Sequence, residues 1–164
     1  MDWLTQYQVV LRAREYEQHD HTELETVVKI CLATGARWSE AESLRKSQLA
    51  KYKITYTNTK GRKNRTVPIS KELYESLPDD KKGRLFSDCY GAFRSALERT
   101  GIELPAGQLT HVLRHTFASH FMMNGGNILV LQRVLGHTDI KMTMRYAHFA
   151  PDHFESVINF NPLA

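Results

Sequence analysis

The sequence predicts a mainly α-helical domain that carries one small antiparallel β-hairpin or sheet, an α+β fold class. Apolar residues recur at helical spacing over most of the chain, and only one pair of short segments alternates as β-strands do. The 164 residues, 41% of them hydrophobic, suffice for one core, and a net charge of +4 at this hydrophobic content excludes intrinsic disorder. We therefore expect a single folded domain over residues 1–164.

The N-terminal part predicts three helices. Residues 2–18 carry apolar side chains at helical spacing. A second apolar run follows the capping-box pair Thr22 and Glu25 and stops at Gly35. Ser39 and Glu42 repeat the capping pattern and predict a short third helix. The intervening segment TGARWSE then places Arg37 at a helix–helix corner.

The hairpin is predicted over residues 53–57 and 65–69, with a cationic tip around Lys60. Pro68 confines the second strand to a sheet edge, because proline cannot donate to a neighbouring strand. Ser70 caps a short helix, and a further helix is expected over 88–100. From residue 110 the chain is almost wholly helical, with segments predicted at 110–124, 127–135, 139–146 and 151–159.

Positive charge is concentrated in residues 43–71, which hold nine cations and no acidic residue. Such a segment is typical of a phosphate-binding surface, and a solvated Lys-rich hairpin is the alternative. The candidate DNA-binding side chains within it are Arg45, Lys46, Arg62, Lys63 and Arg65.

The cysteine content and hydropathy exclude two other classes of protein. Cys31 and Cys89 cannot form a disulfide framework and are interpreted as buried apolar residues. No apolar run approaches the roughly 20 residues that a membrane span needs, and no secretory segment begins the chain. We expect a cytoplasmic protein with no membrane partner.

The segment THVLRHTFASH, residues 110–120, places His111, Arg114 and His115 on one helix face. Two histidines one turn apart suggest zinc, but the guanidinium of Arg114 would repel a dication, so we predict no metal. His111 and Arg114 instead suit an anion, because a planar guanidinium matches a phosphate. His115 by itself is interpreted as a packed core histidine.

Four more residues complete a set suited to phosphate chemistry. Arg37 supplies a second guanidinium, and Lys60 supplies an ammonium at the hairpin tip. The segment LGHTDIKMTMRY places His137 just after a glycine and Tyr146 nine residues later. Each residue alone is ordinary, and the set as a whole indicates a site for a phosphate group.

The segments TGARWSE, THVLRHTFASH, LGHTDI and MRYAH resemble, in order and approximate spacing, the motif boxes of the tyrosine recombinase (phage integrase) family. The resemblance runs from about residue 24 to 149, and HFMMNGGNILVLQRVLGH and YAHFAP are most similar to integrases of temperate bacteriophages. It implies the catalytic-domain fold of that family. It also implies Tyr146 as the nucleophile and a catalytic set of Arg37, Lys60, His111, Arg114 and His137, with Arg62 and Lys63 as alternatives for the hairpin acid.

The resemblance further implies an enzyme that breaks and rejoins DNA through a 3′-phosphotyrosyl link, without metal or cofactor, to integrate and excise phage DNA. Arg37 and Arg114 would hold the nonbridging oxygens, with a hydrogen bond from His137. His111 would accept the phenolic proton, and Lys60 would protonate the leaving oxygen. Glu40 is interpreted as a structural carboxylate that orients a guanidinium or a backbone amide.

The partners implied are double-stranded DNA attachment sites on the chromosome of a bacterial host, and further copies of the chain. We expect a dimer to tetramer on DNA, with the C-terminal tail as a candidate contact between copies. Members of the family usually carry DNA-binding domains before this region. We therefore expect these residues to be the catalytic part of a longer protein.

Two other functions remain compatible with the residues. A non-catalytic basic DNA-binding module needs cations but no nucleophile beside them. A relaxase similar to type IB topoisomerases shares the tyrosine chemistry, but relaxes DNA without a specific site.

Overall fold

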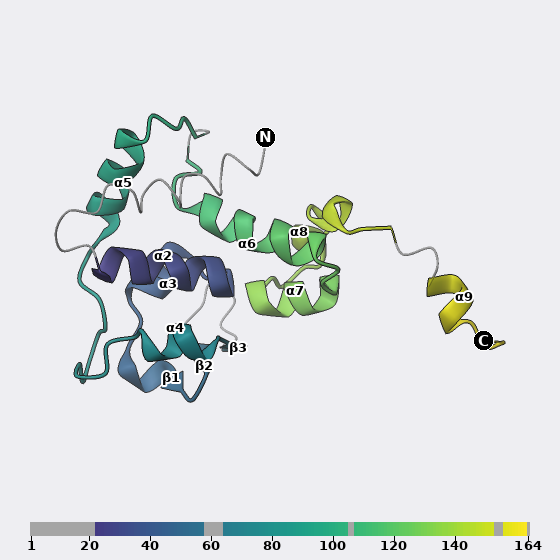
Figure 1. The fold of residues 1–164 in the computed structure, drawn as a ribbon, viewed down its shortest axis with the longest axis horizontal. Helices are drawn as coiled ribbons and strands as arrows, with labels where there is room; N and C mark the ends of the chain where they lie inside the picture. Colours follow the sequence, from purple (N-terminus) through teal and green to yellow (C-terminus); the bar gives the residue numbers. More distant parts are fainter. Residues whose placement is uncertain (1–21, 58–63, 105–106, 153–155, 164) are drawn as a thin grey trace.

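One long helix, α6 (His111–Met123), joins two groups of elements in the computed structural model (Figure 1). The structure describes residues 22–57, 64–104, 107–152 and 156–163. One group comprises helices α2 (Thr22–Thr34), α3 (Trp38–Glu42), α4 (Lys71–Glu75) and α5 (Tyr90–Arg99), the 3-10 turn η1 (Lys46–Gln48) and a sheet. The other comprises α7 (Ile128–Leu135), α8 (Lys141–Met144) and the 3-10 turn η2 (Ala147–Phe149).

The sheet has three short antiparallel strands, β1 (Leu49–Ala50), β2 (Lys53–Tyr56) and β3 (Arg65–Pro68), in the order β1-β2-β3. Pro68 therefore lies on an edge strand, as predicted. Alternation along β2 buries Ile54 and Tyr56 under α2 and α3, and alternation along β3 buries Arg65 and Val67. The sequence did not indicate β1, because two residues are too short a segment to show a period.

The described residues form two hydrophobic clusters, and α6 contributes to both. Val112 and Leu113, in its first turn, pack with α2, α3, α5 and the sheet. Ala118 and Met122, farther along, pack with α7 and with Tyr146. Arg114 lies between these two sets on the same helix and is 5% exposed. A buried cation at the junction of two apolar clusters requires specific partners.

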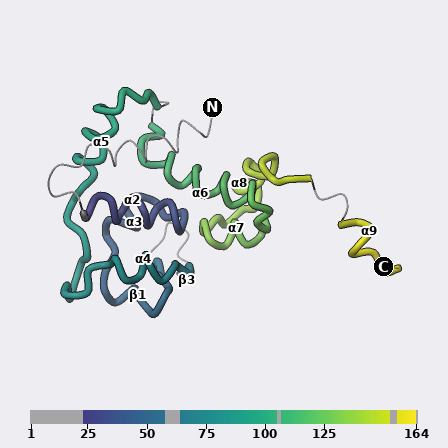
Figure 2. Tube along the Cα trace, in the orientation of Figure 1, coloured from purple at the N-terminus to yellow at the C-terminus, as the bar shows by residue number. Residues whose placement is uncertain are grey.

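Helix α9 (Ser156–Phe160) lies at one end of the molecule, apart from the other helices (Figures 1 and 2). The large apolar side chains of this tail are exposed, namely Val157, Ile158, Phe160 and Leu163. Elsewhere apolar groups of this size are mostly buried, so the tail is unusual in the fold.

Most predicted elements are confirmed, with shifts of one to a few residues at their ends. The short third helix begins differently from the prediction: its N-cap is Arg37 and the capping carboxylate is Glu40, rather than Ser39 and Glu42. Cys31 and Cys89 are buried and unpaired with each other, as expected. The helix predicted over residues 2–18 lies outside the described residues. Among the described helices none is long and apolar enough to cross a bilayer.

Candidate active site

The corner that carries Arg37 is formed by a glycine that ends α2. Gly35 adopts a left-handed φ of 64°, and its N–H donates to the carbonyl of Cys31 at 2.9 Å. A Cβ at this position would lie 2.5 Å from the ring of Phe117 on α6. Only glycine fits both the dihedral angle and the close approach of α6. The turn places Arg37 at the N-cap of α3, facing the start of α6.

Arg114 is held by the carboxyl ends of two helices. Its Nη1 donates to the carbonyl oxygen of Gly35 at 2.7 Å, and its Nη2 donates to that of Leu135, the last residue of α7, at 2.6 Å. These carbonyls carry the partial negative charge of helix C-termini, which favours a cation. Burial, with the charges of Arg37 and Arg65, lowers the pKa of Arg114 to about 10. Arg114 is thus charged at neutral pH and fixed from both sides.

His137 follows Gly136, whose left-handed φ of 67° ends α7. Its Nε2 lies 3.1 Å from Nη2 of Arg114, and its Nδ1 lies 2.8 Å from Oγ1 of Thr143. Since a guanidinium can only donate, Nε2 accepts, and the ring hydrogen is on Nδ1. Burial, followed by the charge of Arg114, lowers the pKa of His137 to about 4. In this arrangement His137 is neutral and orients Arg114.

Tyr146 lies between α8 and η2, is 4% exposed and packs against the second half of α6. Its hydroxyl is 2.6 Å from Nδ1 of His115. Burial raises the pKa of Tyr146, and the positive charges of Arg114 and Arg145 oppose that rise. The phenol is therefore protonated at neutral pH and already has a hydrogen-bond partner.

A mostly buried carboxylate supports Arg37. Glu40 accepts the backbone N–H of Arg37 at 2.8 Å and contacts its Nη1 at 3.2 Å. It also binds Arg65 with both oxygens, at 3.0 Å to Nη1 and 2.6 Å to Nη2. Burial raises the pKa of Glu40, but hydrogen bonds and charge from Arg65 lower it by more, so the net pKa is depressed. The structural role predicted for Glu40 is confirmed.

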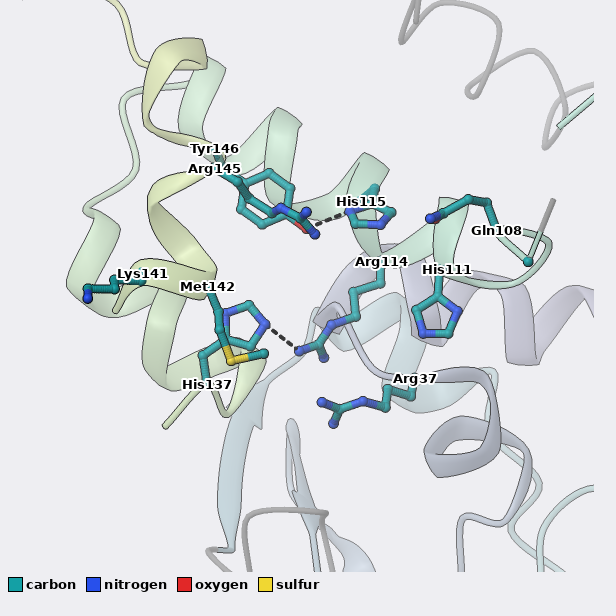
Figure 3. A pocket seen from close by; sticks show the side chains of 11 residues that line it. Arg37, Gln108, His111, Arg114, His115, His137, Lys141, Met142, Arg145 and Tyr146 are labelled. Carbon is teal, nitrogen blue, oxygen red and sulfur yellow. Dashed lines mark hydrogen bonds between the residues drawn. The ribbon is translucent and has the colours of Figure 1, made fainter. Parts of the chain in front are cut away.

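Five of the predicted catalytic residues line one cavity of about 560 Å³ (Figure 3). They come from α3, α6, the end of α7 and the turn after α8, and are Arg37, His111, Arg114, His137 and Tyr146. The other lining residues include His115, Lys141 and Arg145. Figure 3 shows the Tyr146 hydroxyl directed at His115 and the Arg114 guanidinium directed at His137. Four cations and no carboxylate line this cavity, so it suits an anion.

The predicted DNA-binding residues have different environments. Arg45 is exposed, and Lys46 forms an ion pair with Asp79 on the surface. Arg65 is 8% exposed and bound to Glu40, so its guanidinium is inside the protein and not on a DNA-facing surface. The strand alternation explains this, because Arg65 and Val67 face the same side of β3. Lys60, Arg62 and Lys63 lie outside the described residues.

The sequence interpretation missed three residues at the site. His115 was assigned to the core, yet it lines the cavity and contacts Tyr146. Its position next to Arg114 and its place on the His111 face were the available signals. Arg145 and Lys141 also line the cavity, and nothing in the spacing of short helix α8 distinguished them from surface cations. No group of three or more metal-binding side chains is found in the described part of the chain.

The integrases of two phages are similar in sequence to this chain. The chain is 87% identical over 163 residues to the integrase of Escherichia phage 186, covering 99% of this chain and 48% of that protein. It is 67% identical over 150 residues to the integrase of Haemophilus phage HP1, covering 92% of this chain and 44% of that protein. The chain thus spans about half the length of the curated relatives it matches.

Solved structures show the same fold. The catalytic domain of bacteriophage HP1 integrase superposes with a TM-score of 0.88 at 61% identity, covering 99% of this chain and 95% of that one. A second solved structure is the XerH site-specific recombinase in a post-cleavage complex with a palindromic difH substrate. It matches with a TM-score of 0.71 at 20% identity, covering 98% of this chain and 52% of that one. That likeness shows the fold alone.

The family model described as the phage integrase family matches residues 3–153, which include every described residue placed at the cavity. Together with the identities to the phage 186 and HP1 integrases, this match shows that the chain belongs to the phage integrase family of tyrosine recombinases.

Proposed function

We propose that this chain cleaves and rejoins DNA strands as the catalytic domain of a site-specific recombinase that integrates and excises phage DNA. The observation that carries the proposal is that Tyr146 lines the same cavity as Arg37 and Arg114. A phenol is the nucleophile that this reaction needs, and two guanidinium groups are suited to the oxygens of a phosphodiester. A protein that only bound DNA would need the cations but not the tyrosine.

The catalytic work consists mainly of positioning and charge neutralisation. Arg114 is already fixed by two carbonyls, and Nη1 of Arg37 is fixed by Glu40, so both guanidinium groups meet the nonbridging oxygens without a large loss of side-chain entropy. His111, exposed at the start of α6, is placed to donate a hydrogen bond to the same phosphate. His137 acts through Arg114, whose Nη2 it orients.

In the reaction, the phenolic oxygen of Tyr146 bonds to phosphorus and the bond from phosphorus to the 5′ oxygen breaks. The covalent 3′-phosphotyrosyl link conserves the energy of the phosphodiester, so rejoining needs neither a metal nor a nucleotide cofactor. Lys60, or else Arg62 or Lys63, protonates the leaving 5′ oxygen. Arg65 is not a candidate for that step, because its guanidinium is bound to Glu40.

The partner is double-stranded DNA at an attachment site, in the cytoplasm of a host bacterium. The integrases of phages 186 and HP1 support this proposal by sequence, and the XerH complex with its difH substrate supports it by fold. Arg45 and Lys46, with the cations of the hairpin, provide contacts to the DNA backbone. Residues 1–164 form one catalytic domain of a longer protein whose other domains contribute to DNA binding.

The proposal is tested by trapping the covalent intermediate. Wild-type chain is incubated with a pool of nicked duplexes randomised over the core of the site, and the protein–DNA adduct is isolated under denaturing conditions. We expect adduct with wild type, one enriched core sequence, and no adduct with Tyr146→Phe. Equal adduct from both proteins would overturn the proposal. Adduct without any sequence enrichment, together with relaxation of an unrelated supercoiled plasmid, would instead favour the topoisomerase-like function.

The second copy is proposed to contact the C-terminal tail. The side chains of Val157, Ile158, Phe160 and Leu163 are 68–94% exposed, and α9 lies apart from the other helices (Figure 1). An exposed apolar segment of this kind favours contact with another protein surface. Sedimentation on the DNA site should show a dimer or larger assembly for residues 1–164 and a monomer for residues 1–149. Identical sedimentation of the two proteins would refute this contact.

A further inference from the structure

The buried contact between His115 and Tyr146 has a definite direction. The two atoms, Nδ1 of His115 and the phenolic oxygen of Tyr146, lie 2.6 Å apart, which is short for a hydrogen bond between neutral groups. The phenol carries its hydrogen at neutral pH because burial raises the pKa of Tyr146. Burial lowers the pKa of His115, so its ring is neutral and has one free lone pair. Tyr146 therefore donates to Nδ1, and the ring hydrogen of His115 is on Nε2.

The charges around His115 keep Nδ1 unprotonated before DNA binds. Arg145 approaches from the turn after α8, and His111 and Arg114 approach from α6 itself. Lys141 of α8 lines the same cavity. All these groups are cationic or can become so, and they disfavour a positive charge on His115. A phosphodiester bound among Arg37, Arg114 and His111 would offset that repulsion and raise the proton affinity of Nδ1.

From this geometry we propose that His115 is the proton acceptor for Tyr146 in the cleavage step, an inference that rests on the proposed function. The O–H bond of Tyr146 breaks and an N–H bond forms at Nδ1 while the phenolic oxygen bonds to phosphorus. The 5′ oxygen leaves with the electron pair of its bond to phosphorus and takes a proton from the hairpin cation. In the rejoining step Nδ1 returns its proton to the phenolic oxygen.

This assignment changes the expectation for His111. The resemblance to the tyrosine recombinase family implied that His111 accepts the phenolic proton. In the structure the hydrogen-bond partner of the phenol is His115, and His111 is exposed at the first residue of α6. His111 keeps a role as a hydrogen-bond donor to the phosphate.

The test separates proton transfer from simple positioning by replacing His115 with asparagine. The Oδ1 atom of asparagine can occupy the place of Nδ1 and accept the same hydrogen bond, but an amide does not take up a proton. The substrate is the enriched nicked duplex with sulfur in place of the leaving 5′ oxygen, so that leaving-group protonation does not limit the rate. Single-turnover adduct formation is followed from pH 5.5 to 9.5 for wild type, His115→Asn, His111→Asn and His148→Asn.

We expect the wild-type rate to rise with pH and level off below pH 7, where His115 becomes neutral. His115→Asn should be about 100-fold slower at pH 7, and its rate should rise tenfold per pH unit up to pH 9.5, because only the phenolate reacts. His111→Asn should be slower but keep the wild-type plateau. His148→Asn, a substitution of an exposed histidine two residues after Tyr146, should match wild type in both rate and profile.

Two results would overturn the inference while leaving the proposed function intact. One is a wild-type rate and plateau in His115→Asn, which would limit His115 to positioning. The other is loss of the plateau in His111→Asn with its retention in His115→Asn. Absence of adduct from wild type on the whole pool would instead overturn the proposed function.

A measurement on the wild type keeps the inference testable if His115→Asn does not fold. Nitrogen-15 NMR of the imidazole should show His115 with Nε2 protonated and Nδ1 unprotonated at pH 7, and a shift of the Nδ1 resonance in Tyr146→Phe. An Nδ1 that carries hydrogen at pH 7 could not accept the phenolic proton, and that result would refute the assignment.

Discussion

Arg65 and Glu40 give the sharpest stability prediction, because Arg65 is buried and Glu40 is mostly buried. The side chains of Arg65 and Glu40 are 6% and 12% exposed, and two hydrogen bonds of 3.0 Å and 2.6 Å join them. Arg65→Met keeps much of the aliphatic stem and removes the charge. Breaking a buried ion pair from one side costs about 3–5 kcal/mol. Arg37 still contacts Glu40 in the variant, so we expect the lower end, about 3 kcal/mol.

The assay is thermal and urea unfolding of wild type, Arg65→Met, Glu40→Gln and the double variant. A loss of about 3 kcal/mol in a domain of this size corresponds to a fall of about 6–12 °C in the melting temperature. The double variant should be more stable than the sum of the single effects predicts, because it contains no uncompensated carboxylate.

The difference in stability between wild type and Arg65→Met should also depend on pH. Because the pKa of Glu40 is depressed in the folded protein, its pairing stabilises the fold above the unfolded-state value of about 4.3. That contribution is lost as pH falls through the lower folded-state pKa, so wild type and Arg65→Met should converge in acid. A melting temperature of Arg65→Met within 2 °C of wild type, or strict additivity in the double variant, would refute the reasoning.

Three further outcomes are expected. Gly35→Ala should lower the free energy of unfolding by about 1–3 kcal/mol because of the left-handed φ alone, and by more because the new Cβ would contact Phe117. Urea unfolding that shows the variant to be at least as stable as wild type would contradict this. In the folded protein the pKa of His137 is lowered to about 4, so its contribution to stability is present above the unfolded-state pKa of about 6.5 and declines as pH falls toward 4. The free energy of unfolding of His137→Gln, measured against pH, should lack this decline. The same pH dependence in wild type and His137→Gln would contradict this prediction. Arg114→Lys should reduce adduct formation by at least about 100-fold, because an ammonium cannot reach both carbonyls and a phosphate together, and a loss under tenfold would argue against the fixed guanidinium.

The fold was largely predictable from local sequence signals, but the site was predictable from them only in part. Capping residues, glycines at helix ends, and the helical and strand periodicities of apolar residues located most helices and the hairpin, since these signals act within a few residues. Helical spacing placed His111 and Arg114 on one face, and the structure brings Arg37, His137 and Tyr146 to that face. Which residues share the cavity was available only through resemblance to a family, because their contacts join segments more than 20 residues apart.

The failures have a common physical origin. Arg65 was assigned to a DNA-binding surface because it lies in the cationic segment 43–71, but the pairing of β3 turns its side chain toward Glu40 on α3. His115 was assigned to the core because nothing in the sequence places Tyr146 beside it. In both cases a tertiary contact decided the environment of a polar residue, and no local pattern encodes such a contact.

The proposed reaction depends on Tyr146 as the nucleophile. The covalent protein–DNA adduct from wild type should be digested with protease, and the peptide that carries nucleotides should be sequenced by mass spectrometry. We expect the modified residue to be Tyr146, joined to the 3′ end of the cleaved strand. A modification at any other residue, or a 5′ linkage, would contradict it.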